Sequence, residues 1–224
     1  MQAPKKRTGH RRDKDAPRRR LPLLAGAVGA IAALAAVVGV AFVMGGSSTG
    51  VADTMRGAGC TYREVEASQN LPNAELRHLT ELPKGFKYNT EPPTSGYHNP
   101  QTIVWGFYDE PVARLRTVHN LEHGGIVIHY GRRVSDSVVA QLNQFWRDDP
   151  NGIVVAPLPS LGNRMSLAAW TFDQGRLVER AYQGEGRLAL CTNFDEGAFR
   201  DFVDEYRGRG PEPFPVGQLT PGNP

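Results

Sequence analysis

Five short stretches of the chain are rich in β-branched and aromatic residues, the composition typical of β-strands. The clearest is GIVIHY, which follows a Gly turn. Strands this short need a sheet in which to bury their apolar side chains. The predicted strands are residues 61–67, 102–109, 125–130, 152–159 and 164–172.

Two longer segments repeat apolar residues at the spacing of an α-helix. Residues 135–148 begin at Ser135, which can cap a helix, and residues 193–208 place a row of aromatic side chains on one face. The order of strands, helix, two strands and helix predicts an α+β domain, with a mostly antiparallel sheet and both helices on one face. The two strands between residues 152 and 172 are expected to pair antiparallel.

Residues 21–44, LPLLAGAVGAIAALAAVVGVAFVM, carry no charged side chain. A helix of this length, at about 1.5 Å per residue, crosses a hydrocarbon core of roughly 30 Å. We therefore predict a single transmembrane helix in contact with the lipid bilayer. A cleaved signal peptide is the alternative, although the apolar core of a signal peptide is shorter, roughly 7–15 residues.

The positive charge of the chain lies before this apolar segment. Residues 1–20 hold nine Lys and Arg against two Asp, a charge of +7, whereas the whole chain carries +3, which leaves −4 on the rest. Such a tail cannot form a packed core and is predicted to be disordered. By the positive-inside rule it stays in the cytoplasm, where it can contact anionic lipids, and the domain lies outside the cell membrane. Nothing in this distribution indicates nucleic-acid binding.

Composition divides the rest of the chain into three parts. Residues 45–59 are rich in Gly and Ser and are expected to form a flexible linker, and residues 214–224 are expected to form a loose tail. Residues 60–213 between them are enough for one hydrophobic core. Cys60 and Cys191 bracket this domain, and because disulfides persist outside the cell, we predict a bond between them. Two buried free thiols are the alternative.

Three histidines and one glutamate lie within fourteen residues, TVHNLEHGGIVIHY at 117–130. His119 and His123 are four residues apart, so on a helical turn their rings would point the same way. With Glu122 they spell H-x-x-E-H, the motif of zinc peptidases in which two His bind the ion and the Glu activates water. The Gly-Gly pair that follows would stop a helix at once. The sequence therefore leaves open whether this segment is a helical turn or a loop.

Five short sequence blocks of the chain are similar to those of a known family. They are PPTSGYH at 92–98, GFYDEPV at 106–112, VHNLEHGGIVIHY at 118–130, LAAW at 167–170 and GPEP at 210–213. Together they resemble a bacterial family of membrane-anchored proteins, common in actinobacteria and known as a domain of unknown function. The resemblance implies no reaction, but it implies that His98, His119, Glu122 and His123 are the polar signature of the domain. It also implies a Cys just before GFYDEPV, where this chain has Trp105.

His98 lies in a Pro-flanked loop, where no hydrophobic periodicity would place it in a core. Together with His119 and His123 it would supply three imidazoles, a set that suits zinc or copper with one coordination position open. Met165, on a later strand, could add a thioether ligand for Cu(I). We therefore predict a copper or zinc site at His98, His119 and His123.

Two other functions stay open for the same residues. One is a metal-dependent hydrolase in which Glu122 acts as the base beside a bound water. The other is a non-catalytic envelope module that engages another protein, with histidines that only tie the loop together. His129, which alternates with apolar neighbours on a strand, is expected to be structural or exposed.

Overall fold

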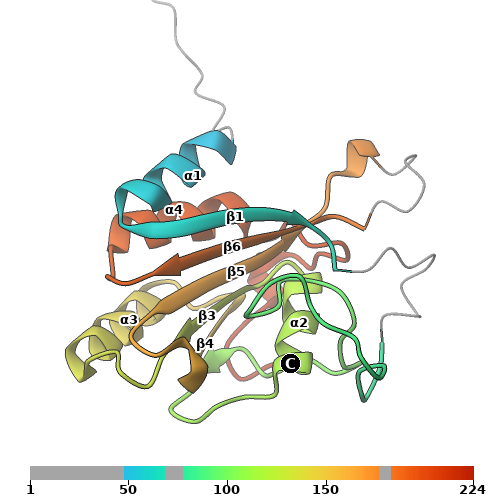
Figure 1. Cartoon of the computed structure of the whole chain (residues 1–224), viewed down its shortest axis with the longest axis horizontal. Coiled ribbons are helices and arrows are strands. Elements are labelled where there is room, and N and C mark those ends of the chain that lie inside the picture. Colours follow the sequence, from blue (N-terminus) through green and yellow to red (C-terminus); the bar gives the residue numbers. More distant parts are fainter. Residues whose placement is uncertain (1–47, 69–77, 177–182) are drawn as a thin grey trace, which may run out of the picture. The chain divides into compact units, whose positions relative to one another are not determined.

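The computed structural model describes residues 48–68, 78–176 and 183–224. Strands of this part form one six-stranded sheet in the order β1-β6-β5-β3-β4-β2 (Figure 1). The strands are β1 Cys60–Glu66, β2 Gly106–Phe107, β3 Ile126–Tyr130, β4 Ile153–Pro157, β5 Met165–Thr171 and β6 Glu185–Cys191. The α-helices are α1 Ser48–Gly57, α2 Arg114–Glu122, α3 Asp136–Asp148 and α4 Glu196–Tyr206, and 3-10 turns occupy Pro159–Leu161, Gln174–Arg176 and Val216–Gln218. The predicted α+β class is confirmed.

The sheet is mixed, which corrects the prediction of a mostly antiparallel sheet. Strands β1, β6, β5 and β3 pair antiparallel, whereas β4 runs parallel to both β3 and β2. The two strands near residues 152–172, β4 and β5, run in opposite directions as predicted, but they are not neighbours, because β3 lies between them and pairs with both. Parallel neighbours need a long crossover connection, and α3 supplies it between β3 and β4.

The strand predicted at residues 102–109 is reduced to the two residues of β2. Ahead of β2 the backbone of Ile103 bonds to a side chain instead of a strand. Ile103 N donates to Asn120 Oδ1 at 2.9 Å, and Asn120 Nδ2 donates to Ile103 O at 2.8 Å. The side-chain amide of Asn120 in α2 thus takes the place of a neighbouring strand and fixes the loop against the helix.

Helices α1, α3 and α4 cover one face of the sheet and share a core with Ile126, Ile128 and Ile153 (Figure 1). The two predicted helices thus lie on one face, as expected. The predicted linker at 45–59 is in part wrong, because most of it is α1. Val51 and Met55, one helical turn apart, are buried, so this segment packs instead of moving freely.

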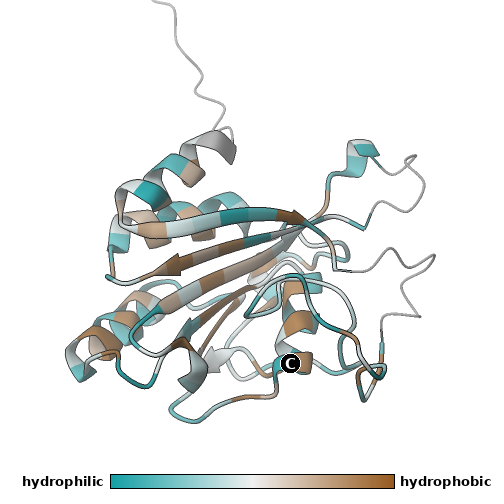
Figure 2. Cartoon of the chain, in the orientation of Figure 1, coloured by the Kyte–Doolittle hydropathy of each residue, from teal (hydrophilic) through white to brown (hydrophobic). Residues whose placement is uncertain are grey.

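Helix α2 and irregular segments cover the opposite face of the sheet. Val127 and Val154 point to this side and pack with Val118 and Leu121 of α2. Every residue of β3 and β5 is buried, and Figure 2 shows hydrophobic residues along these central strands. A sheet covered on both faces accounts for near-continuous apolar strands.

The segment at 214–224 packs against the α2 face, which corrects the expected loose tail. Trp105 N donates to Asn223 O at 2.9 Å, and Gly222 N donates to Trp105 O at 3.1 Å. Leu219 is only 3% exposed. Composition alone does not separate a packed irregular segment from a free one, because Pro and Gly serve both.

The two cysteines predicted to form a disulfide lie together in the structure. Cys60 and Cys191 lie opposite each other on the paired strands β1 and β6 and are bonded. The bond lies on the face of the sheet that α1 and α4 cover, away from α2.

The transmembrane helix predicted at residues 21–44 and the basic tail at 1–20 lie outside the described residues. Among the helices that the structure does describe, none combines the length and the apolar character needed to cross a bilayer.

Candidate metal centre

The HNLEH motif forms the last turn of α2. His119 and Glu122 belong to the helix, and His123 is its C-terminal cap. Gly124 follows with a φ of 82°, a left-handed conformation that glycine adopts without strain and that ends the helix. The turn brings the rings of His119 and His123 to 4.6 Å between centroids. The segment is therefore a helical turn and not a loop.

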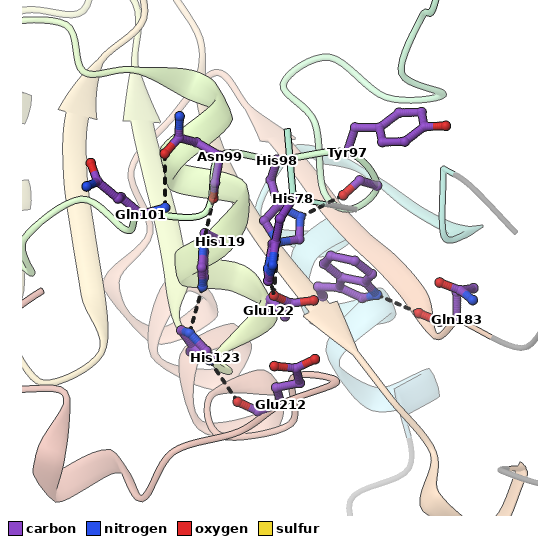
Figure 3. Close-up of polar contacts among 12 residues, drawn as sticks. His78, Tyr97, His98, Asn99, Gln101, His119, Glu122, His123, Gln183 and Glu212 are labelled. Carbon is purple, nitrogen blue, oxygen red and sulfur yellow. Dashed lines mark hydrogen bonds and ion pairs between the residues drawn. The ribbon is translucent and has the colours of Figure 1, made fainter. Parts of the chain in front are cut away.

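Three imidazoles of the site use the same ring nitrogen to bind a backbone carbonyl (Figure 3). The pairs are His98 Nδ1 with Gly96 O at 2.7 Å, His119 Nδ1 with Asn99 O at 2.7 Å and His123 Nδ1 with Glu212 O at 2.9 Å. A carbonyl oxygen only accepts, so Nδ1 carries the hydrogen in each ring, and Nε2 of the neutral ring keeps a lone pair. Histidines that ligate metals are oriented in this way.

The Nε2 atoms of these rings meet one another and a carboxylate. His119 Nε2 lies 2.8 Å from His123 Nε2, and His98 Nε2 lies 2.9 Å from Glu122 Oε2. Two atoms with only lone pairs to offer repel at such distances unless a proton or another cation lies between them. Each contact therefore brings together two atoms whose lone pairs a metal ion could accept.

His78 also belongs to the cluster, which was not expected from the sequence. Its Nε2 lies 3.3 Å from Glu122 Oε2, and its ring stacks on His119 with 5.0 Å between centroids and 12° between planes. A β-bridge to His98 and the hydrogen bond from Leu79 N to His98 O position it. No motif or periodicity marks the sequence around His78, so only the residue type itself could have suggested this role.

Donor atoms of His78, His98, His119 and Glu122 all lie within 4.8 Å of one another. Zn–N bonds of about 2.0–2.1 Å place neighbouring donors of a tetrahedral ion about 3.3 Å apart, so small side-chain rotations would close the set. Of the three predicted ligands, His98 and His119 are in this group. His123 is outside it but contacts His119, and Glu122, expected as a base, is one of the donors.

Burial lowers the pKa of His119 to about 4. The hydrogen bond to the Asn99 carbonyl raises this pKa, the imidazoles of His98 and His123 lower it, and the Glu122 carboxylate raises it. His119 is therefore uncharged at neutral pH. A neutral imidazole with its Nδ1 hydrogen engaged is the form that ligates a metal ion.

Two other residues considered from the sequence lie outside the cluster. Met165 belongs to the core that α3 and α4 cover, on the other side of the sheet, so its thioether is not available to the histidines. His129 is 3% exposed and is not among the clustered donors. Its Nδ1 is buried without a hydrogen-bond partner in the described part of the chain. His129 is thus a structural residue.

The domain is expected to lose stability in acid because His129 resists protonation. Burial, together with a smaller effect of the nearby Arg114 charge, lowers its pKa from 6.5 to about 4. Between these two pKa values the folded protein therefore binds fewer protons than the unfolded chain. The contribution of His129 to the free energy of unfolding is then fully present above pH 6.5 and is lost as the pH falls toward 4. The difference is about 3 kcal/mol. Urea unfolding of wild type and His129→Gln across this range measures it. Equal pH slopes for the two proteins would contradict the prediction.

The GPEP block holds the end of α2. Glu212 N donates to Glu122 O at 3.0 Å, and Glu212 O is the carbonyl that binds His123. Gly210 approaches so closely that a Cβ there would lie 2.2 Å from Glu122 O. Glycine is required for this contact. A segment far along the chain thereby sets the orientation of an imidazole.

Residues 80–217, more than half of the chain, match the family described as "Protein of unknown function (DUF3105)". No curated protein and no solved structure matches the chain. The matched residues include His98, His119, Glu122, His123 and Glu212, whereas His78 lies just before them.

Proposed function

We propose, for a chain that belongs to the DUF3105 family of proteins of unknown function, that it binds a transition metal ion through its cluster of imidazoles and one carboxylate. The buried donors His98, His119 and Glu122 form the fixed part of the site, and His78 or His123 completes it. The observation that supports this most strongly is the shared tautomer. Three backbone carbonyls hold three Nδ1 hydrogens, which reserves the Nε2 lone pairs for an ion.

The two outer imidazoles differ in how they can reach the ion. His123 Nε2 already faces His119 Nε2. The ring of His78 stacks on that of His119, and because an imidazole lone pair lies in the plane of its ring, the two lone pairs lie in separate, nearly parallel planes. His78 must therefore turn to bind the same ion, and its side chain, 29% exposed, has room to do so.

The donor set favours zinc or Cu(II). Imidazole nitrogens with one carboxylate oxygen suit both ions, whereas Cu(I) prefers soft sulfur ligands. The described residues offer no sulfur to the cluster, because the two cysteines are bonded to each other and Met165 lies across the sheet.

A metal-dependent hydrolase has less support than a binding protein. In that mechanism Glu122 would accept a proton from a bound water. Its Oε2 instead contacts His98 and His78, and the side chain is fully buried. This placement suits a ligand that holds the ion, so we assign the protein to metal handling or sensing and not to turnover.

We also propose that the domain works outside the cell, tethered to the membrane by residues 21–44. The uncharged segment behind a basic tail supports the tether. The disulfide supports the location outside the cell, because such bonds persist where the surroundings are oxidising.

Elemental analysis of the full chain, purified without a polyhistidine tag and exposed to Zn(II) or Cu(II), tests the proposal. Wild type is expected to retain a stoichiometric ion, and His98→Gln/His119→Gln is expected to retain none. His129→Gln removes a buried histidine outside the cluster and should bind as wild type does. Thermal unfolding of each protein confirms that it is folded. A folded wild type that takes up neither ion would give the histidines a structural role only.

A further inference from the structure

A surface cavity of about 460 Å³ opens beside the candidate metal centre. His119 and His123 line it, so the cavity reaches the cluster at its His119 side. The polar part of the wall is Arg116, Gln101 and Thr102, and the remaining part is apolar, with Phe214 and prolines. A cavity of this size lies in the range of small-molecule sites, roughly 300–1,000 Å³.

Arg116 supplies the positive charge of the cavity. It lies three residues before His119 on α2, so the two side chains share a helix face with Cβ atoms about 5–6 Å apart. Within the described residues no carboxylate forms an ion pair with Arg116, and its Nε is buried without a hydrogen-bond partner. The terminal N–H groups of this guanidinium also form no hydrogen bond within the described residues, so they can donate to a ligand in the cavity that Arg116 lines.

The net positive charge of the metal-bound cluster would also favour an anion nearby. Neutral imidazoles and the single Glu122 carboxylate leave a divalent ion with a positive charge uncompensated. Arg116 adds to this charge on the open side. An anion in the cavity would neutralise both, and it would do so where water is partly excluded and attraction is stronger.

We propose that this cavity binds a small organic carboxylate, with one oxygen on the metal ion as a fifth ligand beside the four protein donors and the other accepting from Arg116. The inference rests on the proposed function, because the ion must be present. A guanidinium matches the planar geometry of a carboxylate, which a point charge does not. Phe214, 47% exposed with its ring 4.4 Å from His123, offers an apolar surface to the carbon part of the ligand.

Titration of the Co(II)-loaded full chain with benzoate, followed by visible absorption, tests the inference. Benzoate is expected to change the cobalt spectrum in a saturable way. Arg116→Gln should raise the dissociation constant for benzoate about tenfold or more, the loss of one charge-assisted hydrogen bond. Arg147→Gln, an exposed cation on α3, should leave it unchanged. Phe214→Ala should weaken benzoate more than acetate.

The outcomes separate this inference from the proposed function. If cobalt binds and benzoate leaves its spectrum unchanged, the carboxylate site is wrong and metal binding stands. If Arg116→Gln binds benzoate as tightly as wild type, the assignment to this cavity is wrong. If the full chain binds neither Co(II) nor Zn(II), both the cavity ligand and the proposed function fail.

Discussion

Substituting Glu122 with Gln is expected to lower the affinity for zinc about 100-fold. Glu122 is the one carboxylate among the clustered donors of the described residues and is fully buried, so its charge acts on the ion with little screening. Losing one partner of a buried, hydrogen-bonded charge pair costs about 2–5 kcal/mol, and tenfold in affinity is about 1.4 kcal/mol. Competition for zinc with a chromophoric chelator measures the change.

The fold should survive this substitution. His98 keeps its Nδ1 hydrogen on Gly96 O, and its Nε2 lone pair can accept from an amide N–H at position 122. Glu212→Gln is the matched control, because Glu212 contacts His123 through its backbone carbonyl. Zinc affinity that is unchanged in Glu122→Gln, or equally reduced in Glu212→Gln, would refute the assignment of Glu122 as a ligand.

Removing the disulfide with Cys60→Ala/Cys191→Ala is expected to lower the free energy of unfolding by about 4–5 kcal/mol. The bond joins residues 131 apart, and closing so long a loop strongly restricts the unfolded chain. It also ties β1, the edge strand of the sheet, to β6. Urea unfolding of the oxidised wild type and the variant gives the difference.

Reduction of wild type should reproduce the variant, because both remove the same constraint. Zinc affinity should not change in either protein under conditions where it is folded, since the bond belongs to the core opposite α2. A variant as stable as oxidised wild type would show that the unfolded chain is already compact around these cysteines.

Periodicity revealed the elements of this fold better than their arrangement. The apolar spacing of α3 and the β-branched run of β3 are local properties, and both elements lie within a residue of the predicted bounds. The partners of β3 are not local. Its parallel pairing with β4, with α3 as the crossover, was missed by the expectation of a mostly antiparallel sheet. The sequence of 102–109 also suggested a strand, and only the amide of Asn120 explains why little of it forms one.

The candidate site was predictable as far as side-chain chemistry goes. His98, His119 and Glu122 carry ligand atoms, and the sequence pointed to each. What orients them is the backbone of Gly96, Asn99 and Glu212, and every residue type has the same carbonyl. No composition or motif distinguishes those three carbonyls. His78 joins the cluster through a single bridge to His98, a contact between segments that no local pattern encodes.

The cysteine content has a consequence for how the protein matures. The chain has two cysteines in all, so one internal pairing exists and no scrambled isomer of a single chain can form. The competing product is a bond between two chains, and its rate rises with protein concentration. Because thiol–disulfide exchange has no wrong internal bond to correct, dilution and not reshuffling governs the yield of oxidised monomer.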